Sequence, residues 1–339
     1  MSIALSLVIV TVIVIVIVAL LLADFLRWRR GRRAVQRSFQ IARVRGFDIP
    51  YLVVGPPDGP PVLLSTGGGA GIDSVHAMPW LTDAGYRLIA ICRPGYYGVP
   101  LEAAPSLRAQ ADLYAEVLCV LGVREPVHVF GVSAGGPTAL HYAAKHPTRS
   151  LLLWCAVTGR YTPNQASMDS ALGRLVLFTR GQALISWLLS RSARWIPRTT
   201  MATFLRTEST LGKPQIDAVV DQTLACAAHR RRFRTFVDST TPMTELYPGM
   251  MDELHKMGED WTADWARIRA PTLAVASAVD KDVGADHIER VARRLPSATI
   301  LEVRAGGHLV WWGREGEGVI EASLRHLARY TPAGPARGD

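Results

Sequence analysis

The distribution of hydrophobic and polar positions divides the chain into stretches of different character. Residues 3–23 carry no charge and form one uninterrupted apolar run. Short apolar runs then alternate with segments of helical periodicity up to residue 158. Residues 159–263 show helical periodicity only, and the alternation resumes over residues 264–332. This order predicts an α/β protein with a mostly parallel central sheet flanked by helices and a helical insertion.

The predicted sheet comes from apolar runs of strand length. The first two, residues 50–55 and 61–66, flank the turn sequence PPDGP and indicate a hairpin-like pair of strands. Further strands are predicted at residues 86–92, 126–132, 150–157, 270–277 and 298–304. Amphipathic helices are predicted at residues 109–122, 137–147, 285–295 and 315–330.

The insertion is predicted to be helical at residues 168–196, 213–237 and 249–258. Two apolar clusters in its first helix, residues 174–179 and 185–190, lie close to arginines. Such a combination suits a helix that lies in the membrane interface, and it equally suits a helix that packs the insertion onto the sheet. The pattern leaves both interpretations open.

The apolar run at residues 3–23 predicts a membrane anchor, because about 20 apolar residues are needed to cross a bilayer. A cleaved signal peptide would have a positive leading segment, a shorter apolar region and a small-residue cleavage site, and this chain has none of these. The basic flank that follows favours a cytoplasmic location for the rest of the chain. It also predicts contact with anionic headgroups. Its members are Arg27, Arg29, Arg30, Arg32, Arg33 and Arg37.

The composition narrows the range of partners and cofactors. The net charge is +9, which can indicate nucleic acid or an anionic membrane as a partner. No nucleic-acid-binding motif accompanies the charge, so we expect no nucleic-acid partner. The four cysteines, at positions 92, 119, 155 and 226, form no CxxC pair. We therefore expect neither a metal site nor a disulfide framework, and no cofactor.

The sequence GVSAGG at residues 131–136 places Ser133 between a predicted strand and a predicted helix. The pattern G-x-S-x-G is weak evidence alone, but this placement is what a nucleophile elbow requires. Gly131 and Gly135 occupy the positions where side chains would clash in so sharp a turn. The turn predicts Ser133 as a nucleophile and the Ala134 N–H as an oxyanion donor.

A serine nucleophile needs a histidine base and a carboxylate that orients it. His308 follows the last predicted strand in a glycine-rich loop, where its ring can reach the carboxyl edge of the sheet. The strand before it is followed by AVDKDVG, which offers Asp280 and Asp282. We favour Asp280, three residues beyond the strand, over Asp282. The second oxyanion donor is predicted in TGGGAG at Gly68, with Gly67 as its neighbour.

These motifs resemble those of the α/β-hydrolase superfamily, in the branch of esterases and lipases. The resemblance covers residues 44–332 and also includes CRPGYYGVP, PTLAVASAVDKDV and GGHLVWW. It implies an α/β-hydrolase fold with Ser133 as nucleophile, Asp280 as acid and His308 as base. Gly68 and Ala134 match the oxyanion positions, and residues 159–263 match the cap.

The resulting division of the chain is an anchor with a basic segment (1–37), a core (38–158 and 264–332), a cap (159–263) and a disordered tail (333–339). The expected activity is hydrolysis of a carboxylic ester or thioester through an acyl-enzyme. The anchor favours a lipophilic substrate near the membrane. Two alternatives remain: an acyltransferase with the same triad, and a membrane-tethered ligand receptor without turnover.

Overall fold

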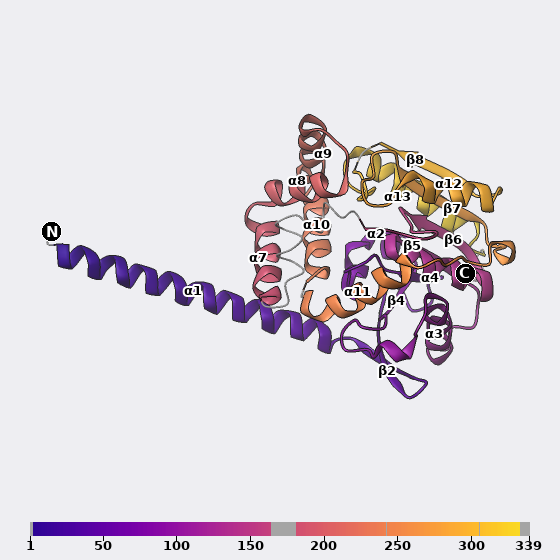
Figure 1. Ribbon diagram of the computed structural model, residues 1–339, viewed down its shortest axis with the longest axis horizontal. Helices are drawn as coiled ribbons and strands as arrows, with labels where there is room; N and C mark the ends of the chain where they lie inside the picture. Colours follow the sequence, from indigo (N-terminus) through magenta and orange to yellow (C-terminus); the bar gives the residue numbers. More distant parts are fainter. Residues whose placement is uncertain (1–2, 164–180, 242, 305, 333–339) are drawn as a thin grey trace, which may run out of the picture.

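A computed structural model of the chain describes residues 3–163, 181–241, 243–304 and 306–332. It shows an α/β body from which one long N-terminal helix, α1, projects (Figure 1). The predicted tail at 333–339 and the apolar cluster at 174–179 lie outside the described residues.

The centre of the body is an eight-stranded sheet of order β1-β2-β4-β3-β5-β6-β7-β8. The pairs β1–β2 and β2–β4 are antiparallel, and all other neighbouring strands are parallel. Every residue of β3 and β5 is buried, as expected for parallel strands covered on both faces. The strands are β1 Gln40–Val44, β2 Phe47–Val54, β3 Pro61–Ser65, β4 Arg87–Ile91, β5 Val127–Val132, β6 Thr148–Trp154, β7 Thr272–Ser277 and β8 Thr299–Val303.

The predicted hairpin between residues 50–55 and 61–66 is wrong. β2 and β3 do not pair, because β4 lies between them and pairs with both. The hairpin is formed instead by β1, which the pattern missed, and β2. Its turn consists of Arg45 and Gly46, which have φ values of 53° and 84°. Two successive positive φ values are typical of the tight turns that join twisted antiparallel strands.

The predicted core helices are present with ends shifted by a few residues. Their apolar faces pack on the sheet, and the resulting core includes Ile49, Leu64 and Phe130, none of which is exposed to solvent. These helices are α3 Leu107–Val120, α4 Gly136–Lys145, α12 Ala285–Arg294 and α13 Arg314–Arg329, and a short helix that was not predicted, α2 Pro79–Asp83, precedes β4. Four short 3₁₀ turns, at Ile72–Ala77, Leu101–Ala103, Ser133–Gly135 and Trp265–Arg267, complete this part.

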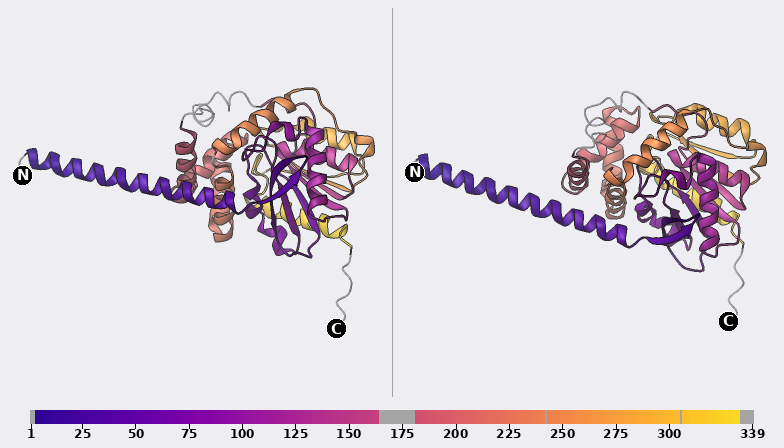
Figure 2. Two further views of the ribbon diagram at one scale, coloured as in Figure 1. Left: turned by 90° about the horizontal axis from the view of Figure 1, so that it is seen from below. Right: turned by 60° about the horizontal axis from the view of Figure 1, so that its bottom comes forward.

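The described chain between β6 and β7 is helical, and its helices cover one end of the sheet (Figures 1 and 2). The single helix predicted at residues 213–237 is in fact two, because Cys226 has extended backbone. The two halves pack on each other and bury an apolar face of each. Periodicity alone does not reveal such a break when no glycine or proline marks it. These helices are α7 Gln182–Trp195, α8 Pro197–Glu208, α9 Lys213–Ala225, α10 Ala227–Ser239 and α11 Met243–Gly258.

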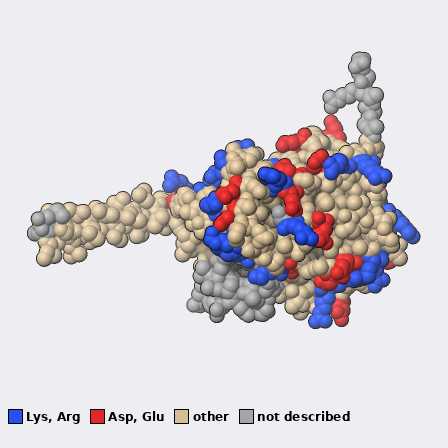
Figure 3. Space-filling model, turned by 90° about the horizontal axis from the view of Figure 1, so that it is seen from above, with Lys and Arg blue, Asp and Glu red and all other residues tan. Residues whose placement is uncertain are grey.

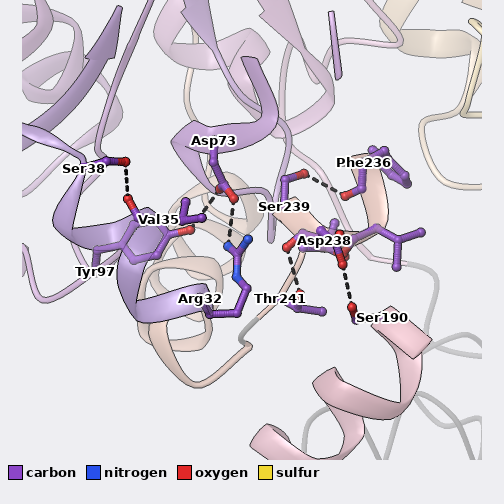
Figure 4. Close-up of polar contacts among 12 residues, drawn as sticks. Arg32, Val35, Ser38, Asp73, Tyr97, Ser190, Phe236, Asp238, Ser239 and Thr241 are labelled. Carbon is purple, nitrogen blue, oxygen red and sulfur yellow. Dashed lines mark hydrogen bonds and ion pairs between the residues drawn. The ribbon is translucent and has the colours of Figure 1, made fainter. Parts of the chain in front are cut away.

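Helix α1 (Ile3–Arg37) is long and apolar enough to span a bilayer, and it continues without a break through the arginine segment. Its projecting part shows no charged residue (Figure 3). Its last turns are part of the body, with Trp28 and Arg32 both buried. Arg32 donates to Asp73 at 2.8 Å, and Tyr97 donates to the same carboxylate (Figure 4). The expectation that Arg32 contacts headgroups is therefore wrong, because an internal carboxylate already binds it.

Candidate active site

The GVSAGG turn is a sharp elbow between β5 and α4. Ser133 has a φ of 50°, a left-handed conformation that is rare and strained for a residue with a side chain. A Cβ atom at Gly131 would lie 2.7 Å from the Cβ of Ala139, and one at Gly135 would lie 2.0 Å from the carbonyl oxygen of Ser65. Only glycine fits these two positions, so the sequence of small residues is a steric requirement of the turn.

His308 and Asp280 form a buried hydrogen-bonded pair. His308 Nδ1 lies 2.9 Å from Asp280 Oδ2, and the side chains are 11% and 3% exposed. Oδ1 of Asp280 accepts the backbone N–H groups of Asp282 and Val283. This arrangement fixes the imidazole ring and leaves Nε2 directed away from Asp280.

The two groups shift each other's protonation. Burial raises the pKa of Asp280, but the charge and hydrogen bond of His308 and the two amides outweigh burial, and the net pKa is lowered. Burial likewise lowers the pKa of His308, but the charge and hydrogen bond of Asp280 dominate and hold that pKa well above its usual range. The pair therefore stabilises the imidazolium form of His308.

Asp282 occupies a different position from Asp280. Its Oδ2 lies 3.8 Å from Nε2 of His308, on the side of the ring opposite Asp280. Its Oδ1 accepts a hydrogen bond of 2.6 Å from the hydroxyl of Tyr161. Because Asp280 holds Nδ1, the geometry favours Asp280 over Asp282 as the carboxylate that orients the ring.

The TGGGAG loop lies against the elbow. A Cβ atom at Gly68 would lie 3.3 Å from the Cβ of Ala134, so the two predicted oxyanion positions are neighbours. Among the described residues, the Gly68 N–H has no hydrogen-bond partner. A free donor beside the N–H of Ala134, at the start of the turn into α4, is what an oxyanion-binding pair requires.

The side chain of Arg93 supports the TGGGAG loop. Its guanidinium donates to the carbonyl oxygens of Thr66 and Gly67 at 3.0 and 2.7 Å. It also forms an ion pair of 2.8 Å with Glu253 on α11, with the two side chains 1% and 4% exposed. The same carboxylate accepts a hydrogen bond from Tyr96, whose hydroxyl in turn accepts the N–H of Gly69. This buried network connects the loop to α11.

One cavity of about 290 Å³ brings these groups together. Ser133, Ala134, Gly67, Gly68 and His308 line it, and Asp280 lies directly behind His308. The structure therefore gathers all of the predicted site residues around one space. Most of the remaining lining residues are apolar. They come both from the sheet with its surrounding loops and helices and from the helices between β6 and β7: Met78, Trp80, Trp154, Val157, Phe204, Phe236, Met250, Leu254, Met257, Leu309, Trp311 and Ile320.

Sequence reasoning missed the contribution of Glu208 at the end of α8. Its carbonyl oxygen accepts the N–H of His308 at 2.9 Å and that of Lys281 at 3.3 Å. It therefore joins the loop that carries His308 to the loop that carries Asp280. Its carboxyl group lines the cavity, where burial raises its pKa to about 7. No local motif signals this role, because it depends on where the end of α8 packs.

A metal ion is not indicated by the same residues. Ligand atoms of Cys155, Asp280 and His308 lie within 4.8 Å of one another. Burial raises the pKa of Cys155 to about 11, so the thiol is neutral at physiological pH. Asp280 and His308 are bound to each other. The donors therefore describe a hydrogen-bonded network rather than a set of free ligands.

Comparison with known proteins agrees with this geometry. The profile of the alpha/beta hydrolase family matches residues 62–322. An uncharacterized hydrolase from Bacillus subtilis, YcgS, is 26% identical over 284 residues, which cover 83% of this chain and 95% of that protein. An alpha/beta hydrolase fold protein from Nakamurella multipartita is 27% identical, with a TM-score of 0.76, 86% of this chain and 99% of that chain being covered.

A likeness at lower identity extends over the N-terminal helix as well. A membrane phospholipase A, described as a bacterial virulence factor, is 20% identical with a TM-score of 0.58, and the match covers 97% of this chain and 99% of that chain. At this identity the likeness shows the fold. Taken together, the chain belongs to the alpha/beta hydrolase family and is an enzyme of the hydrolase class.

Proposed function

We propose that the protein is a serine hydrolase that cleaves carboxylic esters or thioesters through an acyl-enzyme. The observation that carries the proposal is that His308, oriented by Asp280 through Nδ1, lines the same cavity as Ser133 on its strained elbow. His308 takes the proton of the Ser133 hydroxyl as the oxygen attacks the acyl carbonyl, and then returns it to the leaving alcohol or thiol. Water activated by the same histidine releases the acid. The N–H groups of Gly68 and Ala134 stabilise the oxyanion in both steps.

The first test is covalent labelling with a fluorophosphonate probe. Wild type should be labelled at Ser133, and Ser133→Ala should not be labelled. Labelling of the variant at another serine would overturn the assignment. Product analysis with and without an added alcohol then separates hydrolysis from acyl transfer, because a transferase forms the new ester even when water is in large excess.

We further propose that α1 is a retained anchor, that the catalytic body faces the cytoplasm and that the substrate is lipophilic. The absence of a small-residue cleavage site after the apolar run supports retention, because the segment that follows is DFLRWRRGRR. The arginine flank supports the orientation. The apolar wall of the cavity suits an acyl chain. The likeness to a membrane phospholipase A over 97% of the chain is consistent with such a substrate.

The orientation is tested by a reporter fused after residue 339. A reporter that works only in the cytoplasm should be active, and activity of one that works only outside would overturn the orientation. The substrate class is tested with a chain that begins at Asp24, which keeps Trp28 and Arg32 and lacks only the apolar run. Relative to full length, it should lose activity on a long-chain ester in vesicles and keep activity on a short soluble ester. If the shortened chain matches the full-length protein on both substrates, the anchor serves location alone.

A further inference from the structure

Helix α7 carries apolar side chains on one face that remain exposed among the described residues. Leu184 and Leu188 are 50% and 49% exposed, and Trp195 is 63% exposed. Their spacing of four and seven residues places all three in one row along the helix. Ile196, directly after the helix, is also 53% exposed. A face of this kind needs an occupant, since three large apolar side chains in one row are a patch rather than scattered exposure.

The row lies next to the place where α1 leaves the body. Arg191 falls between Leu188 and Trp195 in the same row, and its Nε donates to Asp24 at 2.6 Å. Trp187 lies one helical turn before Arg191. It donates its Nε1 to the same carboxylate at 2.9 Å and packs edge-on against Phe25. Asp24 is the first charged residue after the apolar run. The contacts therefore fix α7 to the end of the candidate membrane span.

The length of α1 sets the level of α7 relative to a bilayer. The 21 residues from Ile3 to Ala23 span about 31 Å at 1.5 Å per residue, close to the roughly 30 Å of a hydrocarbon core. Asp24 then lies at the boundary between acyl chains and headgroups, and so do the side chains that bind it. In Figure 1, α7 lies at the end of the body nearest the projecting part of α1 and runs across the direction of α1.

The positive charges close to Asp24 fit an anionic membrane surface. Arg29, Arg30 and Arg33 follow Asp24 within the next turns of α1, and all three are exposed. Lys and Arg side chains cluster where α1 enters the body (Figure 3). Trp195, the most exposed member of the apolar row, belongs to the residue type that membrane–water interfaces favour.

We infer that α7 lies in the plane of the membrane surface, with Leu184, Leu188 and Trp195 inserted at the boundary between headgroups and acyl chains of an anionic bilayer. The inference rests on the proposed role of α1 as a membrane span. It adds a second contact, so that the body is held in one orientation against the lipid rather than swinging on a single helix. The cap then meets the bilayer surface directly.

The test measures the depth of nitroxide labels on the full-length protein in vesicles of phosphatidylcholine and phosphatidylglycerol. Cys119 and Cys226, which are exposed, are first replaced by serine, and single cysteines are then introduced as Leu188→Cys, Ile13→Cys or Val120→Cys. Ile13 lies in the apolar run, and Val120 at the end of α3 is a matched control, since it is an apolar residue that is 57% exposed. Accessibility to a water-soluble nickel chelate should be at least about fivefold lower at Leu188 than at Val120.

The outcomes separate this inference from the anchoring itself. If the label at Ile13 is as accessible as the one at Val120, the helix does not span and the anchoring proposal fails. If Ile13 is protected but Leu188 matches Val120, the anchor stands and the inference about α7 is overturned. Dipolar broadening between Leu188 labels that persists at low protein-to-lipid ratio would also overturn it, because a second copy of the chain would then cover the row.

Discussion

The cavity has two walls that are built in different ways. The wall from the sheet consists of backbone held by steric constraint and buried charge: the elbow at Ser133, the loop at Gly68 and the His308–Asp280 pair. The wall from the helices between β6 and β7 is made mainly of flexible apolar side chains, such as Phe236 and Met250. The first wall holds its groups in fixed positions and suits the making and breaking of bonds. The second tolerates exchange of volume and suits selection of a substrate.

The largest expected effect comes from the sheet wall. Ser133→Ala should reduce kcat for ester hydrolysis by several powers of ten, on the order of the 10⁶-fold seen when a triad serine is removed. Only the hydroxyl is lost, so the thermal unfolding temperature should stay close to that of wild type. Steady-state kinetics with a chromogenic ester, together with a melting curve, measure both. A variant that retains more than a small fraction of activity would show that another group attacks the substrate.

The next effect distinguishes the two carboxylates. Asp280→Asn should lower kcat by about 10⁴-fold, because an amide favours the wrong tautomer of His308. Asp282→Asn is the matched control and should cost less than about tenfold, since Asp282 contacts the other ring nitrogen at 3.8 Å. Equal losses, or the reverse order, would show that Asp282 orients the ring.

A smaller effect is expected at the junction of the two walls. Arg93→Met removes the cation that binds both Glu253 and the carbonyl groups of Thr66 and Gly67. The buried carboxyl of Glu253 loses its cationic partner and keeps only the hydrogen bond from Tyr96, and such a loss typically costs about 3–5 kcal/mol of stability. The TGGGAG loop also loses its support, so kcat/KM should fall by about 10- to 100-fold.

A second substitution sharpens this test. Adding Glu253→Gln to Arg93→Met removes the unpaired buried carboxyl and should restore part of the stability, measured by urea unfolding. It should not restore kcat/KM, because the loop still lacks its donor. Recovery of both quantities together would mean that Arg93 acts only on stability and does not position the loop.

The smallest effect concerns pH. Since Asp280 and Asp282 both raise the pKa of His308, activity should decline on the acid side at a pH above the usual range of histidine. The protonated ring cannot accept the serine proton, so activity rises as pH increases through that pKa. Asp282→Asn removes one negative charge and should move the acid limb of kcat/KM to lower pH, by about one unit or less. A limb that stays in place would show that Asp282 does not influence the base.

The local sequence patterns were sufficient to predict which residues form the wall of the cavity on the side of the sheet. A buried strand, a glycine-flanked serine and a helix in immediate succession leave one backbone path, because any side chain at Gly131 or Gly135 would collide with neighbouring atoms. The order of strands placed His308 and Asp280 at one edge, since carboxyl ends of parallel strands meet there. The prediction of a membrane span at residues 3–23 likewise needs no tertiary context, because it rests on the length and apolar character of that segment alone.

Tertiary structure alone decided the remainder. The pairing of β2 with β4 and the burial of Arg32 on Asp73 depend on contacts between segments far apart in the sequence, and the break at Cys226 depends on how α9 and α10 pack. The link from Glu208 to the histidine and acid loops is of the same kind. Periodicity reports which face of a segment is buried but not what covers it. The residues proposed for catalysis therefore stand in short motifs of the sequence, while the shape of the cavity and the contacts of α1 with the body follow from packing.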